Sequence, residues 1–432
     1  NMSSNKFSND INKNIIESHK FIYDSFSKRG KRIYYPQLGI GNQSGEAKGC
    51  NINATVGIAK YDNSNVMNLG SLSKLIKAEP ENVFPYMPPH GNITLRKKWL
   101  ELIKQKNNIS NLNSSTPMVT SGITHGLHIV GSLFIDEGDT ILSPSNYWPN
   151  YNLTFKKYFG GNIQTFNMFD NRKFDLRSFE KAYTECSSKR ILLFNFPHNP
   201  TGYSPTYDVA AGIIKVIKKN ALEGQKAIIV FDDAYFGLNY AEDVYPNSLF
   251  GEVSKIDGVL AIKLDGISKE YYSWGLRVGF VTYATNNGND SLYAALENKT
   301  AGIIRSDIST ASTLSQHLFL KSIDDQNFNL DKVNNNKILK ERYFRIIEKY
   351  NSNDDYKKYF SMFPCNSGYF FCVETQTDSE YIRKELLKKF SIGTISMNNN
   401  ILRVAISSIQ TEKIEFFFDS LFNICQKQKN NN

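Results

Sequence analysis

The feature that most constrains the fold is a series of short apolar runs between Met118 and Ala284. The runs are rich in β-branched or aromatic residues and are separated by helix-length or loop-length polar segments, which is typical of a mostly parallel α/β sheet. Several runs are apolar on both faces, as in Ile191–Phe194, and this suits a sheet covered by helices on either side. We therefore predict one seven-stranded sheet, with strands over 118–121, 140–143, 163–166, 191–196, 227–231, 260–264 and 278–283. Ligands of such a sheet bind at the carboxyl ends of its strands.

The pattern changes after a helical stretch over 331–350, which indicates a second, smaller α+β domain. Strands are expected over 369–373, 392–396 and 401–406, a helix opened by a capping box from Thr377 to Glu380, and a last amphipathic helix from about Glu412. The chain of 432 residues is then divided into three parts. Residues 1–60 form an N-terminal arm and part of the small domain, 61–328 the large domain, and 329–432 the C-terminal small domain.

Charge and cysteine content exclude several classes of protein. The 51 basic and 42 acidic residues leave a net charge of +9, but the lysines are scattered along the chain, so we expect no nucleic-acid partner. The chain has no run of about 20 apolar residues, so no membrane span is expected. Five cysteines without metal-like spacing predict neither a disulfide framework nor a metal site, and they fit a reducing cytoplasm.

Three short motifs follow predicted strands in the large domain. They are Asn199–Gly202, Asp232–Tyr235, and Ser268–Lys269 with Gly275–Gly279 further on. Each has an ordinary structural interpretation when taken alone: a turn, a helix cap and a solvated surface segment. Their order and chemistry together point to one reaction type.

Taken together, these motifs resemble the fold-type-I pyridoxal-phosphate enzymes, specifically the class I and II aminotransferases of the aspartate aminotransferase type. The resemblance extends from about Tyr86 to Arg403. It implies that Lys269 holds pyridoxal 5′-phosphate as a Schiff base and, once displaced by substrate, shuttles the proton. It also implies that Asp232 keeps the pyridine nitrogen protonated. Asn199 and Tyr235 would donate hydrogen bonds to the phenolate oxygen, Tyr235 being counted with the catalytic residues and Asn199 also with the substrate contacts.

The resemblance further implies a phosphate site and an aromatic cover for the cofactor ring. The loop before the helix starting at Ile123 would hold the phosphate through Gly122, Ile123 and Thr124, with Arg277 as the fixed positive charge and Ser268 as a further ligand. Trp148 would cover the ring. The alternative for Trp148 is a tryptophan that fills space between sheet and helix.

Three residues outside these loops complete the implied site. Arg403 matches the clamp for the substrate α-carboxylate, and Tyr86 lies in the segment that reaches across a homodimer to complete the partner's site. Arg305 resembles the second arginine of dicarboxylate-specific members, which also acts across the dimer. A surface or phosphate-side arginine at a helix start is the equal alternative. The stretch from Gly39 to Gly57 departs from the family pattern, and the sequence does not indicate its role.

The function implied is an aminotransferase that passes an amino group between an L-amino acid and a 2-oxo acid in a ping-pong cycle. Aspartate or glutamate would be preferred if Arg305 reads a side-chain carboxylate, and aromatic substrates remain open. Another fold-type-I enzyme, such as a C–S lyase, decarboxylase or racemase, is the closest rival. A cofactor-binding regulator is the alternative from another class, but the residues before Tyr34 are too few for a winged helix.

Overall fold

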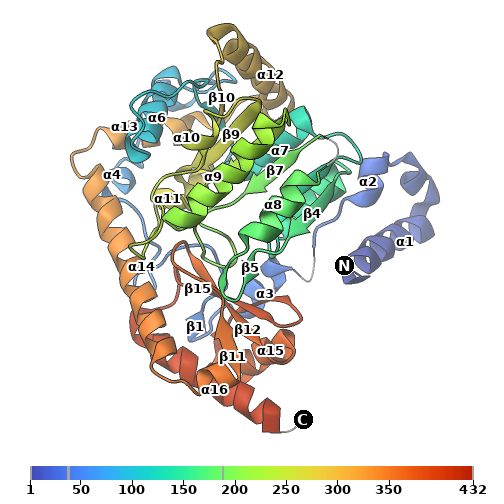
Figure 1. Cartoon of the computed structure of the whole chain (residues 1–432), viewed down its shortest axis with the longest axis vertical. Coiled ribbons are helices and arrows are strands. Elements are labelled where there is room, and N and C mark those ends of the chain that lie inside the picture. The colour runs from blue at the N-terminus through green and yellow to red at the C-terminus, as the bar shows by residue number, and fades with distance from the viewer. Residues whose placement is uncertain (1, 37–38, 187–188, 431–432) are drawn as a thin grey trace.

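The computed structural model describes residues 2–36, 39–186 and 189–430. Its centre is a seven-stranded sheet in the order β2-β10-β9-β8-β7-β3-β4 (Figure 1). The strands, in chain order, are β2 (Met118–Thr120), β3 (Thr140–Pro144), β4 (Asn162–Phe166), β7 (Ile191–Phe194), β8 (Ala227–Asp232), β9 (Val259–Gly266) and β10 (Gly279–Thr285). Neighbouring strands pair in parallel except at β10, which is antiparallel to both β9 and β2. The predicted seven-stranded, mostly parallel sheet is confirmed.

Alternation along each strand divides the apolar side chains between the two faces of the sheet. On β7, Ile191 and Leu193 pack into one hydrophobic cluster, while Leu192 and Phe194 pack into the other. The first cluster includes residues of α6 (Ile93–Lys106) and α7 (Ile123–Phe134). The second includes residues of α8 (Leu176–Thr184), α9 (Tyr207–Leu222) and α10 (Phe250–Val253). Both faces are covered, as the doubly apolar strands require.

A smaller four-stranded antiparallel sheet lies beside the large one, in the order β11-β12-β15-β14 (Figure 1). Its strands are β11 (Phe360–Met362), β12 (Phe370–Thr375), β14 (Ile395–Asn398) and β15 (Ile401–Ala405), and its helices are α15 (Ser379–Phe390) and α16 (Ile414–Asn430). The long α14 (Phe328–Asn351) runs along the edge of the molecule from the large sheet to the small one. The strand β1 (Ile52–Asn53) pairs in parallel with β13 (Ile392–Gly393), so a segment from the N-terminal part of the chain packs against the small domain. The domain boundaries at residues 60 and 328 stay predictions.

Two sequence predictions in this part of the chain were wrong in detail. The cap of α15 is Asp378, which accepts a hydrogen bond from the Glu380 amide at 3.1 Å. Thr377 instead donates to Gln428, and the Glu380 carboxylate pairs with Arg383, so no capping box forms. The predicted strand over 392–396 is divided into β13 and β14, because its first part pairs with β1 and its second with β15.

The remaining helices lie before and around the large sheet. The N-terminal ones are α1 (Met2–Ser25), α2 (Lys28–Arg32), α3 (Ile40–Glu46), α4 (Gly70–Ser73) and α5 (Pro80–Val83). A π-helix (Asn152–Tyr158) follows β3, the short α11 (Ile267–Glu270) follows β9, and α12 (Asp290–Ile308) and α13 (Thr313–Ile323) follow β10. In Figure 1, α1 projects from the body beside α2.

Candidate active site

The strand-end loops of the large sheet meet around a small pocket of about 40 Å³. It opens beside a much larger cavity of about 990 Å³, and the two share Trp148, Asn199, Tyr235 and Lys269. The small pocket is lined by most of the residues predicted for a cofactor: Ile123, Thr124, Trp148, Asn199, Asp232, Tyr235, Ser268, Lys269 and Arg277. Residues from five separate segments of the chain are therefore brought together at one edge of the sheet.

Asp232 is the last residue of β8 and is buried. One carboxylate oxygen accepts a hydrogen bond from the Tyr151 hydroxyl at 2.5 Å, and Asn195 donates to its backbone carbonyl at 2.8 Å. Burial raises the pKa of Asp232 to about 6, against the opposing effects of the Tyr151 hydrogen bond and the Lys269 charge. Apart from the opposing charge of Lys269, the described residues give this buried carboxylate no direct ion pair, and a protonated ring nitrogen would supply one.

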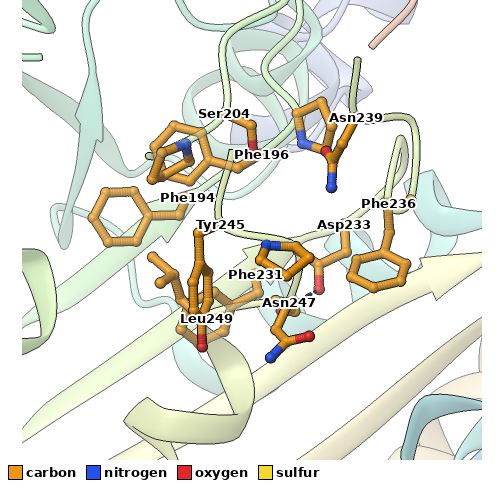
Figure 2. A pocket seen from close by; sticks show the side chains of 15 residues that line it. Phe194, Phe196, Ser204, Phe231, Asp233, Phe236, Asn239, Tyr245, Asn247 and Leu249 are labelled. Carbon is orange, nitrogen blue, oxygen red and sulfur yellow. Dashed lines mark hydrogen bonds between the residues drawn. The ribbon is translucent and has the colours of Figure 1, made fainter. Parts of the chain in front are cut away.

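Asp233 points to the other side of the strand, as expected for neighbours in an extended segment. Its carboxylate accepts from the Ser248 hydroxyl at 2.6 Å and pairs with Lys263. Figure 2 shows Asp233 at the wall of a separate pocket, with Phe236 and Asn247 nearby. That pocket holds only about 20 Å³ and is lined by none of the cofactor residues predicted from the sequence, so Asp233 lies apart from the pocket that Asp232 lines.

Lys269 lies on the single turn of α11 and is half-buried, with its amine 5.4 Å from the centre of the Tyr235 ring. Burial lowers the pKa of Lys269, the Arg277 charge lowers it further, and Asp232 opposes both. Next in the chain, Glu270 is buried and accepts from Lys106 of α6 at 2.7 Å and from Lys332 of α14 at 2.8 Å. The lysine segment is thus held in place while its amine is kept closer to the neutral, nucleophilic form.

Asn199 and Tyr235 face each other at the rim of the pocket. The Asn199 amide nitrogen donates to the Tyr235 hydroxyl at 3.5 Å, and its carbonyl oxygen accepts from Arg403 at 3.2 Å. Burial raises the pKa of Tyr235, so the hydroxyl stays protonated and can donate. Both groups are suited to bind an anionic oxygen between them.

An anion cradle lies at the amino-terminal end of α7. Gly122 precedes this helix with φ +81°, and a Cβ there would collide with the Arg277 guanidinium. Arg277 itself is held by donating to the Trp274 carbonyl at 2.8 Å. The helix start, Thr124 and a fixed guanidinium offer the amides and the positive charge that a phosphate needs, and Ser268 lines the same pocket.

Trp148 lines both cavities and packs edge-on against Tyr151, with 5.6 Å between ring centres. Tyr151 is one contributor that the sequence did not predict, because its partner Asp232 lies 81 residues away. The only local signal is its place three residues after Trp148, at the start of the helical turn.

Arg403 projects from β15 into the larger cavity and is buried. One terminal nitrogen donates to the Thr55 carbonyl at 2.8 Å, and the guanidinium lies 4.0 Å from the centre of the Phe370 ring. Its Nε makes no hydrogen bond among the described residues. Burial lowers the pKa of Arg403 to about 10, so it remains a cation at neutral pH and can clamp a carboxylate.

The segment whose role the sequence did not indicate forms a wall of the larger cavity. Gly39 to Gly41 and Val56 to Ile58 line it, and Thr55 holds Arg403 through its carbonyl. A Cβ on Gly57 would meet the Phe370 ring at 3.4 Å and lie 4.0 Å from the Tyr235 hydroxyl. The backbone at Gly57 therefore approaches the place where Asn199, Tyr235 and Arg403 converge.

Tyr86 and Arg305 lie outside both cavities of this chain. The Tyr86 side chain is 87% exposed, and Arg305, in the last turn of α12, is exposed and donates to Ser309 at 2.6 Å. Both predicted roles need a second copy of the chain, so they stay predictions. Within 2–36, 39–186 and 189–430, no group of acidic, histidine or cysteine side chains could hold a metal ion. None of the helices in those ranges is long and apolar enough to cross a bilayer.

Comparisons with known proteins agree with this arrangement. A family described as "Aminotransferase class I and II" matches residues 52–421. A histidinol-phosphate aminotransferase of Caldanaerobacter subterraneus is 24% identical over 71% of this chain and 78% of its own length. An aspartate aminotransferase of Bacillus subtilis is 23% identical over 52% of this chain, and the aligned part spans about half (53%) of that relative.

Solved structures show the same fold. An aminotransferase from Anaerococcus prevotii superposes with a TM-score of 0.81 at 23% identity, covering 93% of this chain and 99% of that one. The kynurenine aminotransferase of Pyrococcus horikoshii, solved with PMP, gives a TM-score of 0.76 at 15% identity, covering 94% and 98%. At such identities the likeness concerns the fold alone.

Proposed function

The chain belongs to the class I and II aminotransferase family and is a pyridoxal-phosphate-dependent aminotransferase, and on this premise we propose that Lys269 is the lysine that binds the cofactor covalently. The observation that carries the proposal is that Lys269 and Asp232 line one pocket together with the anion cradle at Thr124 and Arg277. Burial shifts the pKa values of the two groups in opposite directions, lowered at Lys269 and raised at Asp232. Titratable groups perturbed in this way gather at catalytic sites.

When bound, pyridoxal 5′-phosphate acts as an electron sink that makes the Cα proton of an amino acid removable. We assign to Asp232 the task of keeping the ring nitrogen protonated, since it is a buried carboxylate at the end of β8 that lines the same pocket as Lys269. We assign to the Lys269 amine the transfer of the Cα proton, because burial and the Arg277 charge lower its pKa and so favour the neutral form that can accept a proton.

Binding and orientation fall to the other residues of the two cavities. Ile123, Thr124, Arg277 and Ser268, which line the inner pocket, are proposed to hold the phosphate together with Gly122 at the start of α7. Trp148 is proposed to cover the ring. Asn199 and Tyr235 would hydrogen-bond the ring oxygen. Arg403 is proposed to bind the α-carboxylate, which its unpartnered Nε supports.

Borohydride reduction of the cofactor-loaded protein, followed by peptide mapping, tests this assignment. We expect the label on Lys269 alone and no fixed label in Lys269→Ala. The exposed Lys218→Ala on α9 serves as control and should label like the wild type. A label on any other lysine, or a wild-type protein that never becomes coloured with added cofactor, would contradict the proposal.

Transamination is proposed over the other reactions available to this fold. Relatives named for histidinol phosphate, aspartate and tyrosine support the general reaction and leave the substrate open. Adding L-glutamate alone should convert the holoenzyme to the pyridoxamine form, seen by absorbance. A C–S lyase or decarboxylase would leave the cofactor in its aldehyde form after turnover.

A homodimer with shared sites is also proposed, with Tyr86 completing the partner's phosphate site and Arg305 reading a dicarboxylate across the interface. The exposure of three apolar side chains on one stretch, Ile76 at 73%, Phe84 at 82% and Tyr86 at 87%, supports a covered surface there. Aromatic substrates are the alternative specificity. Arg305→Ala should slow single turnover with aspartate and glutamate and leave aromatic amino acids unchanged; equal loss on both classes would refute the dicarboxylate role.

A further inference from the structure

We propose that Lys156 and Lys157 form a second anion-binding subsite in the larger cavity, which reads a negatively charged group at the far end of the substrate side chain. The proposed ligand is an amino acid with a distal carboxylate or phosphate. This inference rests on the proposed transamination and names the substrate class for the same site.

The charge of the cavity wall is the first observation. The described residues that line it include four cationic side chains, those of Lys156, Lys157, Lys269 and Arg403. No acidic residue is among the described lining residues. The proposed function uses Arg403 for the α-carboxylate and Lys269 for the cofactor. The proposed function gives no role to the side chains of Lys156 and Lys157, which line the same cavity and make its potential positive.

The local helix geometry turns both lysines toward this cavity. They belong to the π-helix over Asn152–Tyr158, in which the Phe159 amide donates to the Thr154 carbonyl five residues earlier at 3.2 Å. Residues four and five apart share one side of such a widened turn. Accordingly Asn152, Leu153, Lys156 and Lys157 all line the cavity. Isolated π-turns of this kind are frequent at functional sites.

Helix α2 holds the end of this π-helix from behind. Arg29 donates to the Tyr158 carbonyl at 2.9 Å, and Arg32 donates to the Lys157 carbonyl at 3.2 Å. Arg32 is itself fixed by an ion pair with Glu137 at 2.6 Å. These contacts fix the backbone that carries the two lysines, so the subsite is preorganised.

The electrostatic surroundings favour an incoming anion. Burial lowers the pKa of Lys157, and the charges of Lys156 and Arg32 lower it further. The described residues that line this cavity include no carboxylate. A bound anion would relieve the repulsion between these cations, and this relief adds to its affinity.

The dimensions and lining of the cavity suit a ligand with a distal charge. About 990 Å³ is near the upper end of ordinary ligand pockets, and far more than the 40 Å³ of the inner pocket. Ile40, Ile58 and Leu153 supply apolar wall. Tyr34 also lines the cavity, and its ring lies 5.6 Å from the Lys157 amine. A substrate side chain with an apolar stem and a charged end would contact both the apolar and the cationic lining residues of this cavity.

The test compares charged and neutral substrates of one shape on the holoenzyme. Single-turnover rates are measured by absorbance with L-glutamate and its neutral isostere L-glutamine, and with O-phospho-L-serine and L-serine. The double variant Lys156→Gln/Lys157→Gln should lose roughly tenfold or more in the second-order rate constant of single turnover with glutamate or with phosphoserine, as expected for loss of charge-assisted hydrogen bonds. With the neutral amino acids the rate constant should stay within about threefold of the wild-type value. The acidic substrate whose rate constant decreases, glutamate or phosphoserine, identifies the group that the subsite binds as a carboxylate or a phosphate.

Two matched controls sharpen the result. Lys215→Gln/Lys218→Gln on α9 removes the same charge at exposed positions and should change the rate constant with neither acidic substrate. Lys156→Arg/Lys157→Arg keeps the charge and should retain the acidic preference. Binding of glutarate to the holoenzyme, measured by calorimetry, should weaken about tenfold in the glutamine double variant if a carboxylate is read, and binding of inorganic phosphate should weaken if a phosphate is read.

The inference is overturned if acidic and neutral substrates lose equally, if neither loses and both anions bind unchanged, or if the selective loss appears only in Arg305→Gln. Failure of the proposed function is a different result: the wild type would then convert to the pyridoxamine form with none of the amino acids. In that event the anion-binding comparison still decides whether the two lysines form a subsite.

Discussion

Replacing Tyr151 with phenylalanine should raise the pKa of the Asp232 carboxyl group in the cofactor-free protein. The Tyr151 hydroxyl donates a 2.5 Å hydrogen bond to this carboxylate and opposes the effect of burial, which brings the wild-type pKa to about 6. Removing the hydroxyl removes a donor from the charged form only and leaves the burial in place. The carboxyl group is then harder to ionise.

The size of the shift follows from the bond that is lost. A hydrogen bond to a charged group contributes roughly 1.5–3 kcal/mol, and one pKa unit corresponds to about 1.4 kcal/mol. The pKa of Asp232 should therefore rise by about 1–2 units in Tyr151→Phe. At neutral pH the carboxyl group would change from mostly ionised to about half or mostly protonated.

The assay is a pH titration of the apo protein labelled with ¹³C at the aspartate carboxyl carbon, with the signal assigned by its loss in Asp232→Asn. Tyr147→Phe is the matched control, because the Tyr147 hydroxyl donates to Asn152 at 2.8 Å and not to Asp232. The reasoning is refuted if Tyr151→Phe titrates like the wild type, or if both phenylalanine variants shift equally.

Three further outcomes are expected. Gly122→Ala should weaken pyridoxal-phosphate binding at least about tenfold and lower the melting temperature, because a Cβ at φ +81° would strike Arg277; equal cofactor titrations would contradict this. Arg403→Lys should raise KM roughly tenfold for every amino acid tested, since the bidentate fork is lost; an effect on acidic substrates alone would argue against α-carboxylate binding. Burial raises the pKa of Asp265 to about 6, so the folded apo protein binds a proton there more tightly than the unfolded chain does. The stabilisation from this protonated carboxyl group is complete below about pH 4 and is lost as the pH rises through 6. The unfolding free energy of Asp265→Asn relative to wild type should therefore improve by about 1–3 kcal/mol from pH 4 to pH 7, and a denaturation series without that trend would count against it.

The sequence predicted the large sheet well, because its strands are apolar on both faces and each is followed by a turn or helix signal. All seven strands lie within a few residues of their predicted positions. The smaller elements were harder, since tertiary pairing decides them. The two-residue β1 exists because Ile52 and Asn53 pair with Ile392 and Gly393, and no local pattern indicates a partner 340 residues away.

The same division holds for the site. Residues carried by strand-end loops, such as Lys269 and Asp232, were predicted from their motifs, and the structure brings them to one pocket. Tyr151, Thr55 and Gly57 were missed because their relevance comes from contacts with distant residues. No periodicity in the sequence signalled the π-helix after β3.

Glu270, next to Lys269 in the chain, links two helices through its side chain. Its buried carboxylate is bound at once by Lys106, on a helix that packs on the large sheet, and by Lys332, on the helix that continues to the small sheet. Breaking one partner of such a buried pair costs about 3–5 kcal/mol. A movement of the small sheet together with α14 would therefore displace Glu270 and the neighbouring peptide of Lys269. The position of the Lys269 amine then depends on how the large and small sheets lie relative to each other.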